Sequence, residues 1–362
     1  MNWKIWLMVA GLVGLVAVVI PCLKAHAGET VKFSGYKALT PIRHGSLTVF
    51  PVVAAGSHDT HEFLTLDEGL RSGEVVVSEY GSVQPLIRRR VVPMYERRDQ
   101  AEVNRLVLLN NSQRPLILLA GEIVTGGKQD RVIGKDRLVP AESDPVDLSV
   151  FCVEPGRWVG STSKFGGLAS SMAQPNIRAR AMSSKNQEMV WSEVRKAQAE
   201  MSNNLSAPAA AEVRDTSSYA TVMQNGEVRE KVDAVAAPME RDYRSLIQQL
   251  RERNAVGVVV AVNGKIIWAD IFASTDLLQK YWAKLARSYA AEAVIARSSG
   301  GEVEIKSAQQ FLDDMEGRHQ TVESEPGLYR HTEVSGDGFK AFELMSLLPK
   351  TGFDLHVAKM AD

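Results

Sequence analysis

The chain has 362 residues, of which 45% are hydrophobic and 23% are charged, and its formal net charge is −1 at pH 7. A charge this close to zero argues against a general nucleic-acid binder, which carries a strong basic excess, so we expect no nucleic-acid partner. The hydrophobic content over this length is enough for one large or two medium domains to bury a core.

The first 27 residues have the pattern of a signal peptide. Lys4 supplies a positive n-region, residues 5–20 form an apolar run, and Ala25-His26-Ala27 gives the small-x-small pattern that signal peptidase recognises. The run is shorter than the roughly 20 residues that a membrane-spanning helix needs, and Pro21 follows it. We therefore expect cleavage after Ala27 and a periplasmic or secreted protein with no membrane partner. A retained anchor is the alternative.

Cleavage would change both the charge and the cysteine content. It removes Lys4 and Lys24, so the formal charge changes from −1 to −3. It also leaves Cys152 as the only cysteine, which excludes an intramolecular disulfide. The stability of the mature chain must then come from its hydrophobic core.

Residues 28–202 are predicted to form a β-rich domain that ends in a helix. Short runs of Val, Leu and Ile alternate with Gly, Asn, Ser and Asp clusters, which is typical of an antiparallel sandwich or barrel. Ser184 and Gln187 have the spacing of a capping box, and apolar residues then recur at helical spacing to about residue 202. The predicted strands are Leu47–Val53, Glu74–Glu79, Arg89–Pro93, Leu106–Leu109, Pro115–Leu119 and Asp147–Val153.

Residues 203–237 show no sustained period, so we expect a linker or mobile excursion there. Residues 238–362 are predicted to form an α+β region, either separate from the first domain or packed on it. Asn263-Gly264 is a typical hairpin turn, because both residues tolerate positive φ. The other predicted elements are a helix from Pro238 through Arg253, strands Val256–Val262 and Lys265–Phe272, a helix capped by Ser274, a short helix near 307–316, and strands Gly327–Val334, Gly338–Leu347 and Phe353–Lys359. The predicted fold class is α+β, with an N-terminal antiparallel sandwich or barrel followed by helices and a smaller antiparallel sheet.

The segment Leu118–Trp158 concentrates charge between glycine-containing turns. Its glycines suggest a phosphate loop, but Gly127 separates Gly126 from Lys128 and no Ser or Thr follows the lysine, so the P-loop pattern fails. Arginine forks bind carboxylates and phosphates in two-point fashion, although such runs are often only solvated faces. The candidate ligand-binding residues are Lys128, Gln129, Arg131, Arg157 and Trp158.

Fewer residues are candidates for a catalytic role than for ligand binding. Glu122 and Glu154 are candidate general bases, with Lys128 or Arg157 stabilising negative charge. Cys152 is interpreted as a buried strand residue, because no histidine lies near it in the sequence.

A metal-like cluster contains His58 and His61, but no third strong ligand stands nearby. We therefore expect neither a metal nor a cofactor, and a solvated loop at these histidines. Asp270 and Glu292 are interpreted as surface residues of a strand and a helix rather than as catalysts.

Four stretches form a recognisable pattern: Gly121-Glu122, Gly127-Lys128-Gln129-Asp130-Arg131, Leu138-Val139-Pro140-Ala141 and Cys152-Val153-Glu154-Pro155-Gly156-Arg157-Trp158. They resemble a family of bacterial domains, the ARG-and-Rhodanese-Phosphatase-superfamily-associated proteins. The family name records association with ADP-ribosylglycohydrolases and phosphatases, which implies no measured activity and transfers no catalytic residue. The family pattern has a second acid after Glu122, where this chain has Ile123.

Three functions remain open at this point. The first is an exported, non-enzymatic binding or interaction module whose polar Glu/Lys/Arg cleft takes a small anionic ligand or a protein partner. The second is a hydrolase that acts on an anionic or ADP-ribose-like substrate with a Glu general base. The third makes the same charged residues a purely structural ion network.

Overall fold

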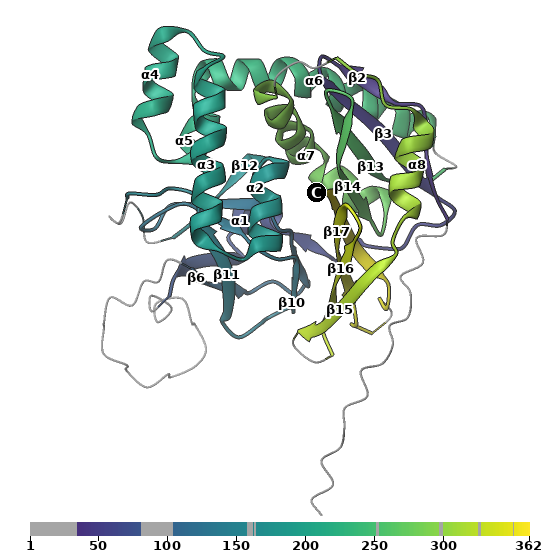
Figure 1. Cartoon of the computed structure of the whole chain (residues 1–362). Coiled ribbons are helices and arrows are strands. Elements are labelled where there is room, and N and C mark those ends of the chain that lie inside the picture. Colours follow the sequence, from purple (N-terminus) through teal and green to yellow (C-terminus); the bar gives the residue numbers. More distant parts are fainter. Residues whose placement is uncertain are drawn as a thin grey trace, which may run out of the picture. The chain divides into compact units, whose positions relative to one another are not determined.

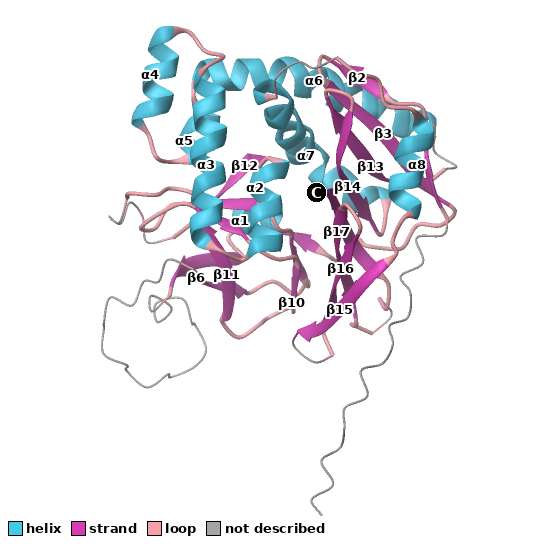
Figure 2. Ribbon diagram, in the orientation of Figure 1, coloured by secondary structure: helices cyan, strands magenta, loops and turns pink. Residues whose placement is uncertain are grey.

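The computed structural model of the chain describes residues 35–80, 104–157, 162, 164–250, 253–296, 300–324, 327–349 and 351–362. The fold class is α+β with mainly antiparallel sheets, as predicted (Figure 1, Figure 2). The predicted signal peptide, the predicted strand Arg89–Pro93 and Trp158 lie outside the described residues.

Both halves of the chain contribute strands to the largest sheet. Its nine strands follow the order β1-β3-β13-β14-β18-β17-β16-β15, with β2 paired to β3. The junction between the halves is the antiparallel pair β3–β13, in which Leu47 lies opposite Val262. The predicted division at residues 203–237 therefore does not separate the sheets. The strands are β1 (Tyr36–Ala38), β2 (Ile42–His44), β3 (Leu47–Ala54), β13 (Ala255–Val262), β14 (Lys265–Phe272), β15 (Gly317–Ser324), β16 (Tyr329–Gly336), β17 (Phe339–Ser346) and β18 (Asp354–Ala361).

Two smaller sheets are built from the first half of the chain alone. The six-stranded sheet has the order β12-β8-β9-β11-β6-β5, and the three-stranded sheet has the order β10-β7-β4 with β4 parallel to β7. Their strands are β4 (Leu64–Thr65), β5 (Val75–Glu79), β6 (Arg105–Asn110), β7 (Leu116–Leu118), β8 (Glu122–Thr125), β9 (Arg131–Ile133), β10 (Arg137–Val139), β11 (Val146–Cys152) and β12 (Gly166–Met172).

The helices include three in the segment that was expected to be a linker. Residues 203–237 contain α4, α5 and the first half of α6, so that expectation is wrong. Val213, Val222 and Val228 from these helices are buried in the main hydrophobic core. Each short helix restarts the helical phase, which is why no sustained period is visible in the sequence. The helices are α1 (Leu66–Ser72), α2 (Pro175–Ala179), a π-helical turn (Arg180–Ser184), α3 (Gln187–Ser202), α4 (Ala207–Asp215), α5 (Tyr219–Gln224), α6 (Gly226–Gln249), α7 (Thr275–Ile295) and α8 (Ile305–Asp313).

Pro238 lies inside α6 rather than in its first turn. The true start is capped by Asn225, whose side chain accepts hydrogen bonds from the amides of Glu227 and Val228. The Asn263-Gly264 hairpin turn is confirmed, with φ values of 51° and 79°. Ser274 caps α7 as predicted, through a hydrogen bond from the Leu277 amide.

Helix α7 brings polar side chains into the interior. It contacts β12 of the six-stranded sheet as well as β13 and β14 of the largest sheet, whereas α8 contacts β1 and packs with a separate apolar cluster (Figure 1). Lys284, Ser288 and Glu292 on α7 are all buried. In the described part of the chain, none of the helices combines the length and the apolar character that crossing a membrane requires.

Candidate functional site

Two turns of the six-stranded sheet lie against each other. Strands β9 and β11 pair so that Arg131 is opposite Cys152, which places the turn before β9 beside the turn after β11. The Gln129 side chain donates from Nε2 to the carbonyl of Glu154 at 3.0 Å, and the Asp130 amide donates to the Glu154 carboxylate at 3.0 Å. Arg157 donates from Nη1 to the carbonyl of Gly127 at 3.1 Å. The sheet therefore brings together five of the residues singled out in the sequence, namely Lys128, Gln129, Arg131, Glu154 and Arg157.

The acids in these turns are already engaged by the chain. Arg157 donates to both carboxylate oxygens of Glu154, at 2.7 Å from Nε and 2.6 Å from Nη2. Asp130 accepts hydrogen bonds from the Gly126 amide at 3.0 Å and from the Ser218 hydroxyl at 2.8 Å. The Glu154 carboxylate raises the pKa of Arg157, and burial raises the pKa of Asp130. These contacts hold the two turns in one arrangement.

Gly127 is required by its surroundings and by its backbone. Its φ of 54° is left-handed, and a Cβ there would lie 2.2 Å from the ring of Phe165 and 2.5 Å from Oε1 of Glu79. The loop can therefore close over Phe165 only with a glycine at this position.

Glu79, at the end of β5, is a member of the site that the sequence reasoning missed. Its Oε1 accepts a hydrogen bond from the Lys128 amide at 2.6 Å. Its Oε2, like Oε1 of Gln129, is buried and has no hydrogen-bond partner among the described residues. The only local feature is an acid at the end of a valine-rich strand, which does not indicate its partner. We call the following residues the loop cluster: Glu79, Lys128, Gln129, Asp130, Arg131, Glu154 and Arg157.

Arg131 and Cys152 form the buried floor of the loop cluster. Arg131 is fully buried, and burial lowers its pKa. Cys152 is buried as predicted, and burial raises the pKa of its thiol. The side chain of Gln187 accepts from the Cys152 amide at 2.8 Å and donates to its carbonyl at 2.9 Å, so it pairs with the end of β11 as a neighbouring strand would. These properties keep the cysteine a thiol rather than a reactive thiolate.

Glu122 lies apart from the loop cluster in an ion pair of its own. Its carboxylate accepts from Lys284 at 2.9 Å and from the Leu119 amide at 2.9 Å, and Asp67 lies 2.8 Å from the same lysine. Burial raises the pKa of Glu122. Burial alone would lower the pKa of Lys284, but Glu122 and Asp67 raise it. Glu122 therefore links β8 to α7 and does not join Glu154 in one pocket.

A second charged group, which we call the sheet network, is fully buried between the largest sheet and the smaller ones. Arg178 donates to both oxygens of Asp270, at 2.9 and 3.0 Å. His356 lies 3.0 Å from Asp270 and 2.5 Å from Asp136, and the Tyr289 hydroxyl donates to Asp270. The sheet network consists of Asp136, Arg178, Asp270, Tyr289 and His356, all with side chains shielded from solvent.

The electrostatics of the sheet network keep its ions charged. Burial alone would raise the pKa of Asp270, but Arg178 and His356 hold it well below its usual range. Burial alone would lower the pKa of His356, but Asp136 and Asp270 raise it to about 9. Two cations therefore balance two carboxylates. The interpretation of Asp270 as a surface residue is wrong, because strand β14 is covered on both faces.

Glu292 is also buried rather than on the surface. It accepts from the side chain of Gln174 at 3.0 Å and from the amide of Asn176 at 3.3 Å. Burial raises its pKa to about 7. Helix α7 is buried around most of its circumference, which a one-face reading of its sequence did not anticipate.

The candidate metal residues His58 and His61 contact different partners. The His58 ring stacks on Phe353 with the ring centroids 4.0 Å apart. His61 is exposed, and its Nε2 lies 3.3 Å from Asp276. Among the described residues, no group of three or more His, Cys, Asp or Glu side chains has an arrangement that could hold a metal ion.

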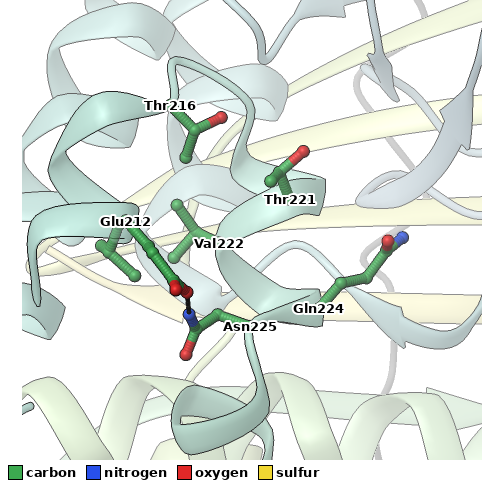
Figure 3. Close-up of a pocket in the computed structure, with 7 residues that line it drawn as sticks. Glu212, Thr216, Thr221, Val222, Gln224 and Asn225 are labelled. Carbon is green, nitrogen blue, oxygen red and sulfur yellow. Dashed lines mark hydrogen bonds between the residues drawn. The ribbon is translucent and has the colours of Figure 1, made fainter. Parts of the chain in front are cut away.

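A pocket of about 190 Å³ opens between α4 and α5 (Figure 3). Glu212 accepts a hydrogen bond from the Asn225 side chain at 2.8 Å across it. None of the residues of the loop cluster lines this pocket. Its lining residues are Glu212, Val213, Thr216, Thr221, Val222, Gln224 and Asn225.

Comparison with known families gives one match. The family described as the ARG and Rhodanese-Phosphatase-superfamily-associated Protein domain matches residues 35–358, so the resemblance noted in the sequence is confirmed. Neither the curated proteins nor the solved structures gave a match.

Proposed function

Since the chain belongs to the ARG and Rhodanese-Phosphatase-superfamily-associated Protein domain family, whose function is unknown, we propose that it is an exported binding module rather than an enzyme, and that it binds its ligand at the loop cluster. The observation that carries this proposal is the pair of buried acceptors, Oε2 of Glu79 and Oε1 of Gln129, for which the described chain supplies no donor. Buried polar atoms in folded proteins nearly always have a partner, so a bound group is the natural complement.

The state of the candidate bases argues against a hydrolase. A general base needs a free lone pair within hydrogen-bond reach of the proton that it removes. The Glu154 carboxylate is held by a two-point contact with Arg157 and by the Asp130 amide. The Glu122 carboxylate is held by Lys284 and the Leu119 amide, away from Glu154. Glu122 is fully buried and Glu154 is 8% exposed, so little of either carboxylate is open to water.

A structural role accounts better for the other charged groups than for the loop cluster. The Glu122 to Lys284 pair and the sheet network are buried and connected to backbone groups, and the sheet network is balanced in charge. The loop cluster is also neutral overall if its three acids and three bases are all charged, which gives no surplus positive charge for an anion. Arg157, however, is about a quarter exposed, so the cluster reaches the surface.

Export is proposed on the basis of the first 27 residues, with Lys4, the apolar run 5–20 and Ala25-His26-Ala27. Cell fractionation of the full chain would test it. We expect the mature protein in the periplasm or medium, with an N-terminus that begins at Gly28. An unprocessed chain in the cytoplasm would contradict the proposal.

Binding is tested by the melting temperature of the full chain with a panel of amines, sugars, organic acids and phosphates. We expect at least one compound to raise the melting temperature of the wild type and to lose its effect in Gln129→Ala. Gln248→Ala, at an exposed position on α6, is the matched control and should behave as the wild type. Turnover of a p-nitrophenyl ester or phosphate that disappears in Glu154→Gln would favour the hydrolase instead.

A further inference from the structure

The two acceptors in question, Oε2 of Glu79 and Oε1 of Gln129, belong to side chains that are almost completely shielded from solvent. Glu79 is 8% exposed and Gln129 is 4% exposed. Each side chain uses its other polar atom within the cluster, because Oε1 of Glu79 accepts from the Lys128 amide and Nε2 of Gln129 donates to the Glu154 carbonyl. The backbone of the loop therefore fixes both side chains, and leaves one acceptor of each for something else.

Among the residues that the structure describes, the Glu79 carboxylate also lacks a direct counter-ion. No ion pair between described residues includes Glu79, whereas Arg157 is engaged by Glu154 and by Asp130, the latter at 3.7 Å. Glu79 acts on Arg131 at longer range. Its charge raises the pKa of Arg131, although burial lowers that pKa by more. A buried carboxylate held by one backbone amide is an incomplete arrangement, because buried charges are normally paired.

These contacts define the chemistry of the missing group, and the inference rests on the binding function proposed above. We infer that the loop cluster binds a cationic N–H donor, an ammonium or a guanidinium group, with Glu79 and Gln129 as its acceptors. Such a group offers donors only, and its charge complements the unpaired carboxylate. An anionic ligand would instead present acceptors to both atoms and would be repelled by Glu79. The ligand class is therefore the opposite of the anion that the arginine content of the sequence suggests.

Four small compounds test whether the ligand is an ammonium or a guanidinium group. Methylammonium and methylguanidinium chloride represent the two cations, methylurea is a neutral analogue of methylguanidinium, and acetate is the anion. The readout is the melting temperature of the full chain at pH 7 and constant ionic strength. We expect a saturable rise of about 2 °C with one or both cations, and none with methylurea or acetate.

The comparison is made between variants, because guanidinium compounds also act on the unfolded chain. Glu79→Gln preserves the shape of the side chain and removes its charge, and it should abolish the rise. Glu74→Gln, at an exposed acid just before the same strand, should retain it. Gln129→Leu removes the second acceptor and should weaken the cation response at least threefold, which keeps the test available if Glu79→Gln does not fold.

The possible results separate the inference from the function that it deepens. No stabilisation by either cation, or equal stabilisation in Glu79→Gln, would overturn the inference. Stabilisation by acetate that is lost in Gln129→Leu would also overturn it, while leaving the binding function in place. Absence of any variant-dependent response, together with ester or phosphate turnover, would remove both.

Discussion

The sheet network and the loop cluster both gather acids and bases, yet they differ in completeness. In the sheet network, each oxygen of Asp136 and Asp270 has a donor, and all side chains are shielded from solvent. In the loop cluster, Glu79 and Gln129 each keep a buried acceptor for which the described residues supply no donor, and Arg157 reaches the surface. Charge density alone therefore does not mark a binding site. Unfilled hydrogen-bonding capacity near the surface is the better mark.

The largest expected effect follows from breaking the sheet network at its centre. Asp270→Asn removes the charge that Arg178 and His356 share, and so leaves buried positive charge without compensation. We expect a loss of about 3–5 kcal/mol in the free energy of unfolding, measured by chemical denaturation. Asp276→Asn changes an exposed acid on α7 and should cost less than about 1 kcal/mol. A similarly small loss for Asp270→Asn would mean that the sheet network contributes little to the stability of the fold.

The second expected effect is an alkaline loss of stability that arises in the buried interior. The folded-state pKa of Glu292 is about 7 and that of His356 is about 9, against ordinary values of 4.5 and 6.5. A group with a raised folded pKa binds its proton more tightly in the folded state, so its contribution is complete below the ordinary value and is lost as the pH rises through the raised one. Stability should therefore fall between about pH 5 and pH 7 through Glu292, and between about pH 7 and pH 9 through His356.

Each of these two contributions is on the order of 3 kcal/mol at most, from about 1.4 kcal/mol per pKa unit. Denaturation of the wild type at a series of pH values would measure the slope. Glu292→Gln should flatten the lower part of the curve, and His356→Gln should flatten the upper part. A lower part that stays as steep in Glu292→Gln, or an upper part that stays as steep in His356→Gln, would contradict the assignment concerned.

How far the sequence predicts the molecule depends on whether the signal is local. The Asn263-Gly264 turn and the strands beside it were predictable, because the turn chemistry and the apolar runs lie within a few residues. The contact between the turns of the loop cluster depends on the pairing of β9 with β11, which the sequence alone did not specify. Glu79 joins that site across 49 residues of chain, and nothing near it in the sequence reports this.

The errors have the same origin. Asp270 lies on a strand that the sequence predicts only as one arm of a hairpin. Its buried partners Arg178 and His356 are 92 and 86 residues away in the chain. The segment 203–237 looked irregular because three helices of different phase share it, and only packing on α3, α6 and α7 fixes each one. Long-range pairing, rather than local pattern, decided these cases.

A third, smaller effect tests how tightly the loop cluster is built. Gly127→Ala should cost about 2–3 kcal/mol, from a positive φ and from contact with Phe165. Gly45→Ala is the matched control, because Gly45 has a similar φ of 59° but no atom within 4 Å of the added Cβ, and should cost about 1 kcal/mol. Equal losses for the two variants in chemical denaturation would mean that Phe165 and Glu79 move away from the added Cβ at little cost. The loop cluster would then be less rigid than the sheet network.

The smallest effect separates the two regions most directly. Arg157→Lys keeps the positive charge but loses the two-point contact with Glu154, so it should cost about 0.5–1 kcal/mol in chemical denaturation. Arg195→Lys, at an exposed arginine on α3 that pairs with Glu188, should be neutral within about 0.3 kcal/mol. A loss for Arg157→Lys as large as that of Asp270→Asn would mean that the loop cluster holds the fold together as the sheet network does. A small loss is what a site requires, because groups that recognise a ligand at the surface can be changed without unfolding the protein that carries them.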